Sequence, residues 1–343
     1  MGVGHHTRYV SAARQTDFDT PETSADAVGE VESEGFQQSY DILKREDMNY
    51  YGSAKAVVSK LYSEGQFSMA LQPCKFTLMM LHGIMGADSE ETDGTVLRTF
   101  TELPITSNAE LPVFTFFVGR DDTEHRFPGQ VIESISVSAS IGEYAMMTVN
   151  TIGPKQSSST ETLAVAVPSY TGDAAHFQKA YVQFEAAATS SAYSALVQSV
   201  DFEIKTNRDI DNTYNLASDT CNRPAPPTMR EVSGSITFHK ALLAGDVASN
   251  EVYFNELMAG TGSVVNPSGT NPALSILFEV DASNFIRFDF NKLIYEMPET
   301  SVSGRDSQTM TVNFHALYDL GDQNQIMSIN CQSSDGATDY DAL

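Results

Sequence analysis

The sequence contains no tryptophan and only three cysteines, and both scarcities limit what the protein can be. Cys74, Cys221 and Cys331 lie far apart, and no Cys-x-x-Cys pair occurs. An odd number of widely spaced cysteines argues against a disulfide framework and against a structural zinc site. Such cysteine usage is typical of proteins that assemble in a reducing cytoplasm.

Long apolar runs are missing as well. No stretch approaches the roughly 18 consecutive apolar residues that a membrane-spanning helix requires. No apolar segment follows the N-terminal residues, so we expect no signal peptide. The myristoylation pattern fails because His6 stands where Ser or Thr is needed. We therefore expect no membrane association.

Basic residues are scarce relative to acidic ones. The chain has 20 Lys and Arg against 45 Asp and Glu, for a net charge of −25, and no basic run occurs. Tight non-specific binding of nucleic acid needs clustered Lys and Arg, so the average surface should repel it. The acidity can be a solubility device or an adaptation to a salty environment.

Recognisable catalytic motifs are also absent. The sequence has no phosphate-binding loop, no dinucleotide-binding glycine pattern, no Gly-x-Ser-x-Gly elbow and no His-Glu-x-x-His. We predict that the protein is not an enzyme, with no catalytic, cofactor-binding or metal-ligating residues and no cofactor. Three segments are weaker candidates for a binding site, and for each of them a purely structural role is favoured. They are the terminal pair His5-His6 as a metal site, Asp209-Ile210-Asp211-Asn212 as a calcium loop, and the stiff segment Arg223-Pro224-Ala225-Pro226-Pro227 as a peptide-ligand motif.

What the sequence does contain is a strand-rich pattern with a few helical segments. Residues 53–64 carry apolar side chains at helical spacing after Ser53, a plausible N-cap, and residues 75–86 read as an apolar helix that ends at a glycine. Alternating or apolar stretches predict strands at residues 66–71, 113–118, 131–139 and 144–151. The last two form a hairpin around Gly142.

The second half of the chain repeats this order of elements. The four parallels are Gly65-Gln66-Phe67-Ser68-Met69 with Gly234-Ser235-Ile236-Thr237-Phe238, residues 78–86 with 252–260, residues 112–116 with 272–276, and Met147-Thr148-Val149-Asn150 with the identical Met310-Thr311-Val312-Asn313. Two β domains of one class share some likeness by chance. The shared order of strand, helix, proline-led strand and hairpin nevertheless favours a true duplication.

This pattern predicts five segments. They are an N-terminal arm (1–35), a first module (36–151), a linker with short strands near 163–167 and 180–184 (152–198), a second module (199–320) and an acidic C-terminal arm (321–343). The N-terminal arm is either a disordered terminus or a segment that orders against a neighbouring subunit.

Three stretches resemble the major tail tube proteins of long-tailed phages and tailed archaeal viruses. The first is the opening at residues 8–21, with its aromatic and its Thr-Pro. The second is the Pro-Gly turn and alternating strand at 126–137, and the third is the pair of strands at 199–207 and 226–238. The likeness covers most of residues 7–318. The strong acidity and the long segment 152–198 depart from the family pattern.

The resemblance implies a mainly β fold with two tandem tail-tube-type β-sandwich or barrel modules, each with a flanking short helix. It implies a structural subunit of the virion tail, assembled in the host cytoplasm, whose rings stack helically through arms and hairpin loops. It also implies a ring of three chains with pseudo-sixfold symmetry, or alternatively of six chains, that contacts other tail proteins. Viral DNA would pass through the lumen without specific binding.

Two other functions remain open at this stage. One is another virion structural protein, such as a head–tail connector or a capsid decoration. The other is a carbohydrate-binding or hydrolytic β protein, which would show clustered surface aromatics and a spaced carboxylate pair. Tyr50-Tyr51 is the nearest approach to such a cluster.

Overall fold

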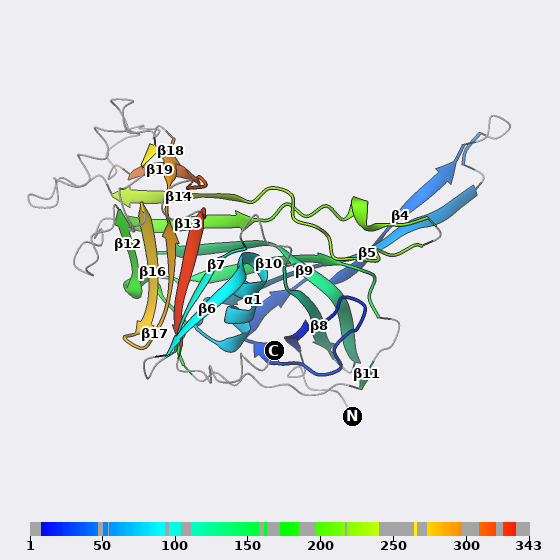
Figure 1. Ribbon diagram of the computed structural model, residues 1–343, viewed down its shortest axis with the longest axis horizontal. Coiled ribbons are helices and arrows are strands. Elements are labelled where there is room, and N and C mark those ends of the chain that lie inside the picture. Colours follow the sequence, from blue (N-terminus) through cyan, green and yellow to red (C-terminus); the bar gives the residue numbers. More distant parts are fainter. Residues whose placement is uncertain are drawn as a thin grey trace, which may run out of the picture.

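The fold is mainly β, as predicted, and in the part of the chain that the structure describes it consists of two antiparallel sheets with one α-helix (Figure 1). The computed structural model describes residues 8–46, 51–53, 55–92, 96–103, 111–121, 123–157, 161–162, 172–184, 197–216, 218–239, 264–265, 273–296, 309–319 and 325–333. Within these ranges neither sheet closes on itself.

The larger sheet has fourteen strands. Its main path runs in the order β15 (Val264–Val265), β18 (Leu293–Tyr295), β19 (Thr309–Ala316), β14 (Glu231–His239), β13 (Val197–Lys205), β9 (Thr123–Ser140), β10 (Met146–Gly153), β5 (Lys55–Ala70) and β3 (Val31–Glu34). The remaining strands pair off this path: β1 (Tyr9–Gln15), β2 (Ala27–Gly29), β4 (Gln37–Arg45), β8 (Val113–Arg120) and β11 (Glu161–Thr162).

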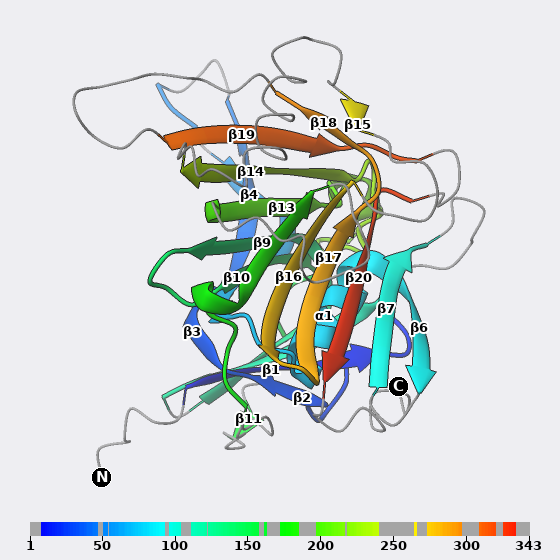
Figure 2. The same ribbon diagram turned by 90° about the vertical axis from the view of Figure 1, so that its left-hand side faces the viewer.

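The smaller sheet has six strands and combines both halves of the chain (Figure 2). Its order is β12 (Ala180–Phe184), β16 (Leu274–Asp281), β17 (Asn284–Phe290), β20 (Met327–Ser333), β7 (Val96–Glu102) and β6 (Gly86–Thr92). The described residues include two short 3-10 helices, Phe177–Lys179 and Asp211–Thr213.

The two sheets pack through a shared aromatic core. The ring of Phe202 on β13 lies 4.8 Å from the ring of Phe288 and 5.5 Å from that of Phe290, both on β17. Phe290 lies 5.5 Å from Phe314 on β19. All four rings are buried. Because they come from strands of both sheets, their contacts join the two sheets.

Replacing Phe202 by alanine should therefore destabilise the fold strongly. Deletion of a buried aromatic ring costs about 3–5 kcal/mol. Chemical denaturation would measure the loss, with Phe285→Ala as a control because Phe285 on β17 is only half-buried. Equal losses in the two variants would contradict the assignment of Phe202 to the central core.

The helix predicted at residues 75–86 is confirmed as α1 (Lys75–Met85). Every residue from Phe76 to Met85 is buried, and the helix contacts β9 of the larger sheet and β6 and β7 of the smaller one (Figure 2). The helix ends at Gly86, which has φ 96° and donates its N–H to the carbonyl of His82. Glycine adopts this left-handed conformation without steric cost.

The helix predicted at residues 53–64 is wrong, because this segment belongs to β5. The spacing of Val57, Val58 and Leu61 fits a helix, yet the segment pairs with β4 from Arg45↔Lys55 to Gln37↔Glu64. β-branched residues fit a strand well. A hairpin partner that is nearby in sequence therefore outweighed a short helical pattern.

The other predicted elements are confirmed where they fall within the described residues. The residues of β8 from Val113 to Gly119 are all buried, and the alternating Phe67, Met69 and Leu71 are fully buried. β9 and β10 form the expected hairpin, and Gly142 in its turn has φ 89°. β12 covers the expected strand Ala180–Phe184. The strand expected at 163–167 and the second-half helix expected at 252–260 lie outside the described residues.

Both ends of the described chain lie inside the fold. β1 pairs with β8 from Tyr9↔Gly119 to Gln15↔Val113, and its Val10 and Ala12 are buried. β20 pairs with β17 on one side and with β7 on the other. Among the described residues, no helix is long and apolar enough to cross a membrane.

β4 and the first half of β5 form a two-stranded ribbon that projects from the body of the molecule (Figure 1). The ribbon, defined here as residues 37–45 and 55–64, carries exposed apolar side chains on both strands, among them Ile42, Leu43, Val57 and Val58. Including Tyr40 and the nearby Tyr51, this region holds six of the ten large exposed apolar residues in the described part of the chain. Isolated ribbons are marginally stable in water, so this one is suited to packing against a partner.

Candidate functional site

The two faces of the larger sheet differ sharply where β9, β13, β14 and β19 lie side by side. On one face, Val137, Phe202 and Phe314 point into the core between the sheets. Gly234 lies between the two phenylalanines, and a side chain there would meet Phe202 Cβ at 2.6 Å and Phe314 Cζ at 2.7 Å. This face is therefore fully used for packing.

The opposite face is polar and is called the polar face below. Residues directly opposite one another on antiparallel strands share a face. The pairings between neighbouring strands therefore place the polar side chains of this face in rows that cross the sheet. The first row is Ser68, Thr148, Ser136, Glu203, Ser233 and His315; the second is Ser138, Asp201, Ser235 and Asn313; the third is Gln66, Asn150, Ser134, Lys205 and Glu231. These rows define the polar face.

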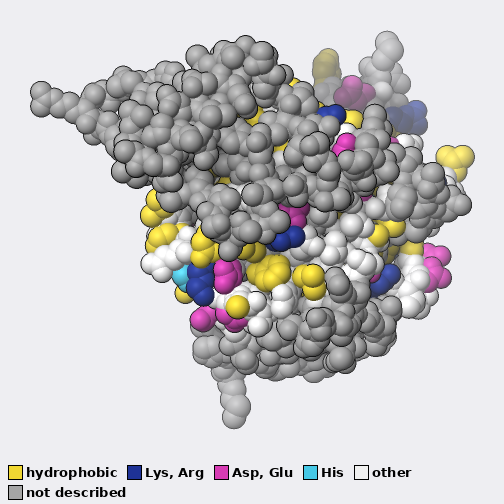
Figure 3. Space-filling model, turned by 60° about the vertical axis from the view of Figure 1, so that its left-hand side comes forward, with side chains coloured by type: hydrophobic (Ala, Val, Ile, Leu, Met, Phe, Trp, Pro, Cys, Tyr) yellow, Lys and Arg dark blue, Asp and Glu magenta, His cyan; other side chains and the backbone are white. Residues whose placement is uncertain are grey.

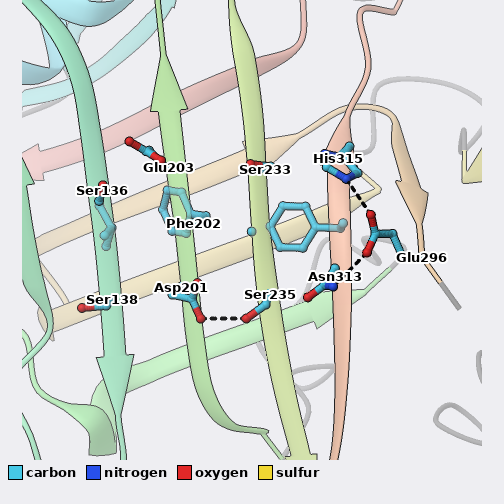
Figure 4. Close-up of a pocket in the computed structure, with 13 residues that line it drawn as sticks. Ser136, Ser138, Asp201, Phe202, Glu203, Ser233, Ser235, Glu296, Asn313 and His315 are labelled. Carbon is cyan, nitrogen blue, oxygen red and sulfur yellow. Dashed lines mark hydrogen bonds and ion pairs between the residues drawn. The ribbon is translucent and has the colours of Figure 1, made fainter. Parts of the chain in front are cut away.

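Hydrogen bonds within the polar face hold its side chains to one another (Figure 4). Ser235 donates to Asp201 at 2.7 Å. On β19 and just after β18, the Asn313 amide donates to Glu296 at 2.8 Å, and His315 Nε2 lies 3.0 Å from the same carboxylate. A shallow, open pocket lies over these residues. The groups satisfy one another instead of converging on a ligand.

Carboxylates outnumber cations on this face. Lys205 Nζ lies 2.8 Å from a carboxylate oxygen of Glu203. Hydrogen bonds from Asn313 and then from His315 lower the pKa of Glu296, so this exposed carboxylate stays ionised. On the side of the molecule drawn in Figure 3, described Lys and Arg side chains likewise lie next to acidic ones.

This chemistry does not favour tight binding of a polyanion. Hydroxyl and amide side chains carry no net charge, and carboxylates repel phosphate, whereas unpaired Lys and Arg would bind it. No group of three or more His, Cys, Asp or Glu suited to a metal ion occurs in the described part of the chain.

The weaker sequence candidates fall on structural positions. Asp209 accepts a hydrogen bond from the Asn212 backbone N–H at 3.3 Å, and Asp211 forms an ion pair with Lys60 of the ribbon at 2.7 Å. Ala225, in the proline-rich segment, accepts from Arg208 Nη1 at 3.0 Å. These loops thus pack against their own chain.

The remaining candidates give no site. His5, His6 and Tyr50 lie outside the described residues, and Tyr51 is exposed. Cys74, Cys221 and Cys331 are buried and form no disulfide. Burial raises the pKa of the Cys221 thiol, so this group is a poor nucleophile.

Sequence reasoning did not identify the polar face. The alternation of Ser134, Ser136 and Ser138 with Ile135 and Val137 was visible as a strand signal. It did not reveal that the serines line up with Asp201, Glu203 and their neighbours from the second half. Strand register, which brings the rows together, depends on pairing across about 70 residues of chain.

Two open sheets, one of them with a polar face of hydroxyl, amide and carboxylate side chains, define a mainly β protein. A family model described as phage tail tube protein matches residues 6–316. The chain belongs to this family and is a structural subunit of a viral tail tube, as the resemblance implied. It is therefore a component of the virion tail. A search of curated proteins found no match.

Proposed function

We propose that the chain carries two tandem β modules and polymerises through them into stacked rings, with the polar face lining the channel for viral DNA. The observation that carries this proposal is the matching register of strand pairs in the two halves. The central part of each module is the segment expected from the sequence, 36–151 and 199–320, between the arms 1–35 and 321–343. We further propose that the protein has no enzymatic activity and assembles in the host cytoplasm.

The first match is between the strand pair β5·β10 of the first half and the strand pair β14·β19 of the second half. In the first half Thr148 stands opposite Ser68, and in the second half Thr311 stands opposite Thr237. The hydroxyls are hydrogen-bonded in both cases, at 2.8 Å and 3.0 Å. These are the positions that the repeated tetrapeptide Met-Thr-Val-Asn aligns, so sequence and pairing support the same duplication.

The second matching pair is β3·β5 with β13·β14. Val31 stands opposite Met69, the register shifts by one residue, and Ser33 stands opposite Ser68. In the second half, Val197 stands opposite Phe238, the same shift follows, and Ser199 stands opposite Thr237. A shared bulge supports common descent because bulges are specific backbone features.

The outer strands match as well. β1 lies beside β8 with Ala12 opposite Phe116, and β12 lies beside β16 with Val182 opposite Ile276. The hairpins β8·β9 and β16·β17 correspond through Phe116↔Phe127 and Ile276↔Phe288. On this comparison the modules extend into the proposed arm 1–35 and the linker 152–198.

The join between the halves supplies the template for polymerisation. β13 of the second half pairs with β9 of the first, from Ser199↔Ser140 to Lys205↔Ser134. β3 is the first-half counterpart of β13. It is the last strand on the described path of the larger sheet. We infer that the edge of β3 pairs with the second module of another chain, which hides both edges.

A closed ring follows if this join repeats. Three chains would supply six modules with pseudo-sixfold symmetry, and six chains per ring is the alternative. Rings would stack helically through arms and hairpins and would meet other tail proteins at the ends of the tube. The polar face would line the lumen, where its carboxylates and hydroxyls let DNA slide without specific binding.

Electron microscopy of the purified full-length protein tests this proposal. We expect hollow filaments or stacked rings, and two-dimensional averages of end views should show sixfold or pseudo-sixfold symmetry. Mass measurement of single rings distinguishes three chains from six. Discrete monomers at every salt concentration tested would contradict the proposal.

A further inference from the structure

We propose that Glu203, together with Glu231, masks Lys205, so that this cation on the polar face cannot hold DNA passing through the tube. The inference rests on the proposed function, since it takes the polar face as the lumen wall. It goes beyond a generally acidic wall because it assigns a specific task to particular carboxylates. They are positioned to neutralise a cation and not merely to add negative charge.

Lys205 is the one Lys or Arg in the rows that define the polar face. Its side chain is about half exposed, and its Nζ lies 2.8 Å from a Glu203 carboxylate oxygen. Glu231 stands directly opposite Lys205 on β14. The hydrogen bond to Glu203, followed by the charges of Glu203, Glu231 and Glu133, raises the pKa of Lys205.

The second ionisable base on this face has the same arrangement. His315 Nε2 lies 3.0 Å from Glu296, and both side chains are about half exposed. Glu296 is fixed from its other side by Asn313 at 2.8 Å. Each base on the polar face is thus paired with a carboxylate from its own strand or from a neighbouring segment.

The physical consequence concerns phosphate contacts. A free lysine on a channel wall releases counterions when it meets phosphate, and each such contact adds about one unit to the slope of log K against log salt. A surface ion pair contributes little to stability. The Lys205–Glu203 ion pair is therefore better explained by its preventing phosphate binding to Lys205 than by a contribution to folding stability.

Asp201 provides a matched control for Glu203. It lies two residues earlier on the same strand and the same face, and it accepts a hydrogen bond from Ser235 at 2.7 Å. Within the described part of the chain, no ion pair involves Asp201. Glu203→Gln and Asp201→Asn change the net charge equally, but only the first uncovers a cation.

The test measures binding of a short fluorescent DNA duplex over a range of salt concentrations, to the unassembled protein and to sedimented filaments. We expect Glu203→Gln to tighten binding severalfold at low salt and to steepen the salt slope by up to about one unit. Asp201→Asn should leave the salt slope at its wild-type value. The double variant Glu203→Gln/Lys205→Gln should return to wild-type behaviour.

Equal effects of Glu203→Gln and Asp201→Asn would overturn the proposal, because net charge alone would then explain binding. An unchanged salt slope in Glu203→Gln would overturn it as well. If the wild-type protein forms no filaments, the proposed tube function fails instead. The measurement on unassembled protein still decides whether Glu203 masks Lys205.

Discussion

Replacing Glu32 by proline is expected to block polymerisation while leaving the subunit folded. Glu32 lies on β3 between Val31 and Ser33, which correspond to Val197 and Ser199 of β13. Its counterpart is therefore Gln198, whose carbonyl accepts the Ile141 N–H at 3.2 Å, on the side of β13 that faces β9. By this correspondence the backbone carbonyl of Glu32 faces outward, towards the proposed neighbouring chain.

The alternation of backbone bonds applies to the residues that follow Glu32 on β3. On the side that faces β5, the Gly35 N–H just after β3 donates to the Gln66 carbonyl of β5 at 2.7 Å. Residue 34 should then face away from β5, because bonding alternates along an antiparallel strand, but the bulge between Val31 and Ser33 interrupts this alternation at Glu32. Proline is disfavoured in the central strand that β3 would become at the join, and a buried carbonyl left unsatisfied there costs about 1–3 kcal/mol. The critical concentration for assembly should rise tenfold or more.

Sedimentation and electron microscopy measure assembly, and thermal melting of the subunit measures folding. Glu32→Ala serves as the control, since it retains the N–H and should polymerise like the wild type. Ser33→Pro, which removes a donor facing β5, should instead lower the melting temperature. Normal filaments from Glu32→Pro would exclude β3 as the joining edge.

Removing the apolar side chains of the ribbon is expected to weaken stacking between rings. Leu43 stands opposite Val57, and Ile42 stands opposite Val58, so the two pairs lie on opposite faces of the ribbon. All four side chains are exposed in the single chain. Burying each against another subunit would contribute about 1 kcal/mol or more, given about 1.5–3 kcal/mol for complete burial.

Threonine is the suitable replacement because it keeps β propensity while removing apolar surface. The variants Leu43→Thr/Val57→Thr and Ile42→Thr/Val58→Thr control for one another. We expect at least one pair to raise the critical concentration for filaments by tenfold or more, with unchanged melting of the subunit. Wild-type filament growth in both variants would show that the ribbon does not mediate stacking.

Local signals predicted those elements whose partners lie within the same short segment. α1 has mostly apolar residues from Phe76 to Met85 and a glycine stop at Gly86, so the sequence indicated both the type of this element and its end. The hairpin β9·β10 was readable for the same reason, since Gly142 supplies the left-handed turn residue. The ribbon was not, because Val57, Val58 and Leu61 satisfy a helical and an extended pattern equally well.

The candidate site depended on contacts that no local pattern contains. The sequence alone indicated a strand-rich acidic chain, a family resemblance and a repeated Met-Thr-Val-Asn, since composition and short motifs are properties of the chain itself. Tertiary structure placed Ser136 beside Glu203, and Glu203 beside Ser233. Register over such separations is set by burying Phe202 and Phe314 on the opposite face, because a slip of one residue would exchange core and surface.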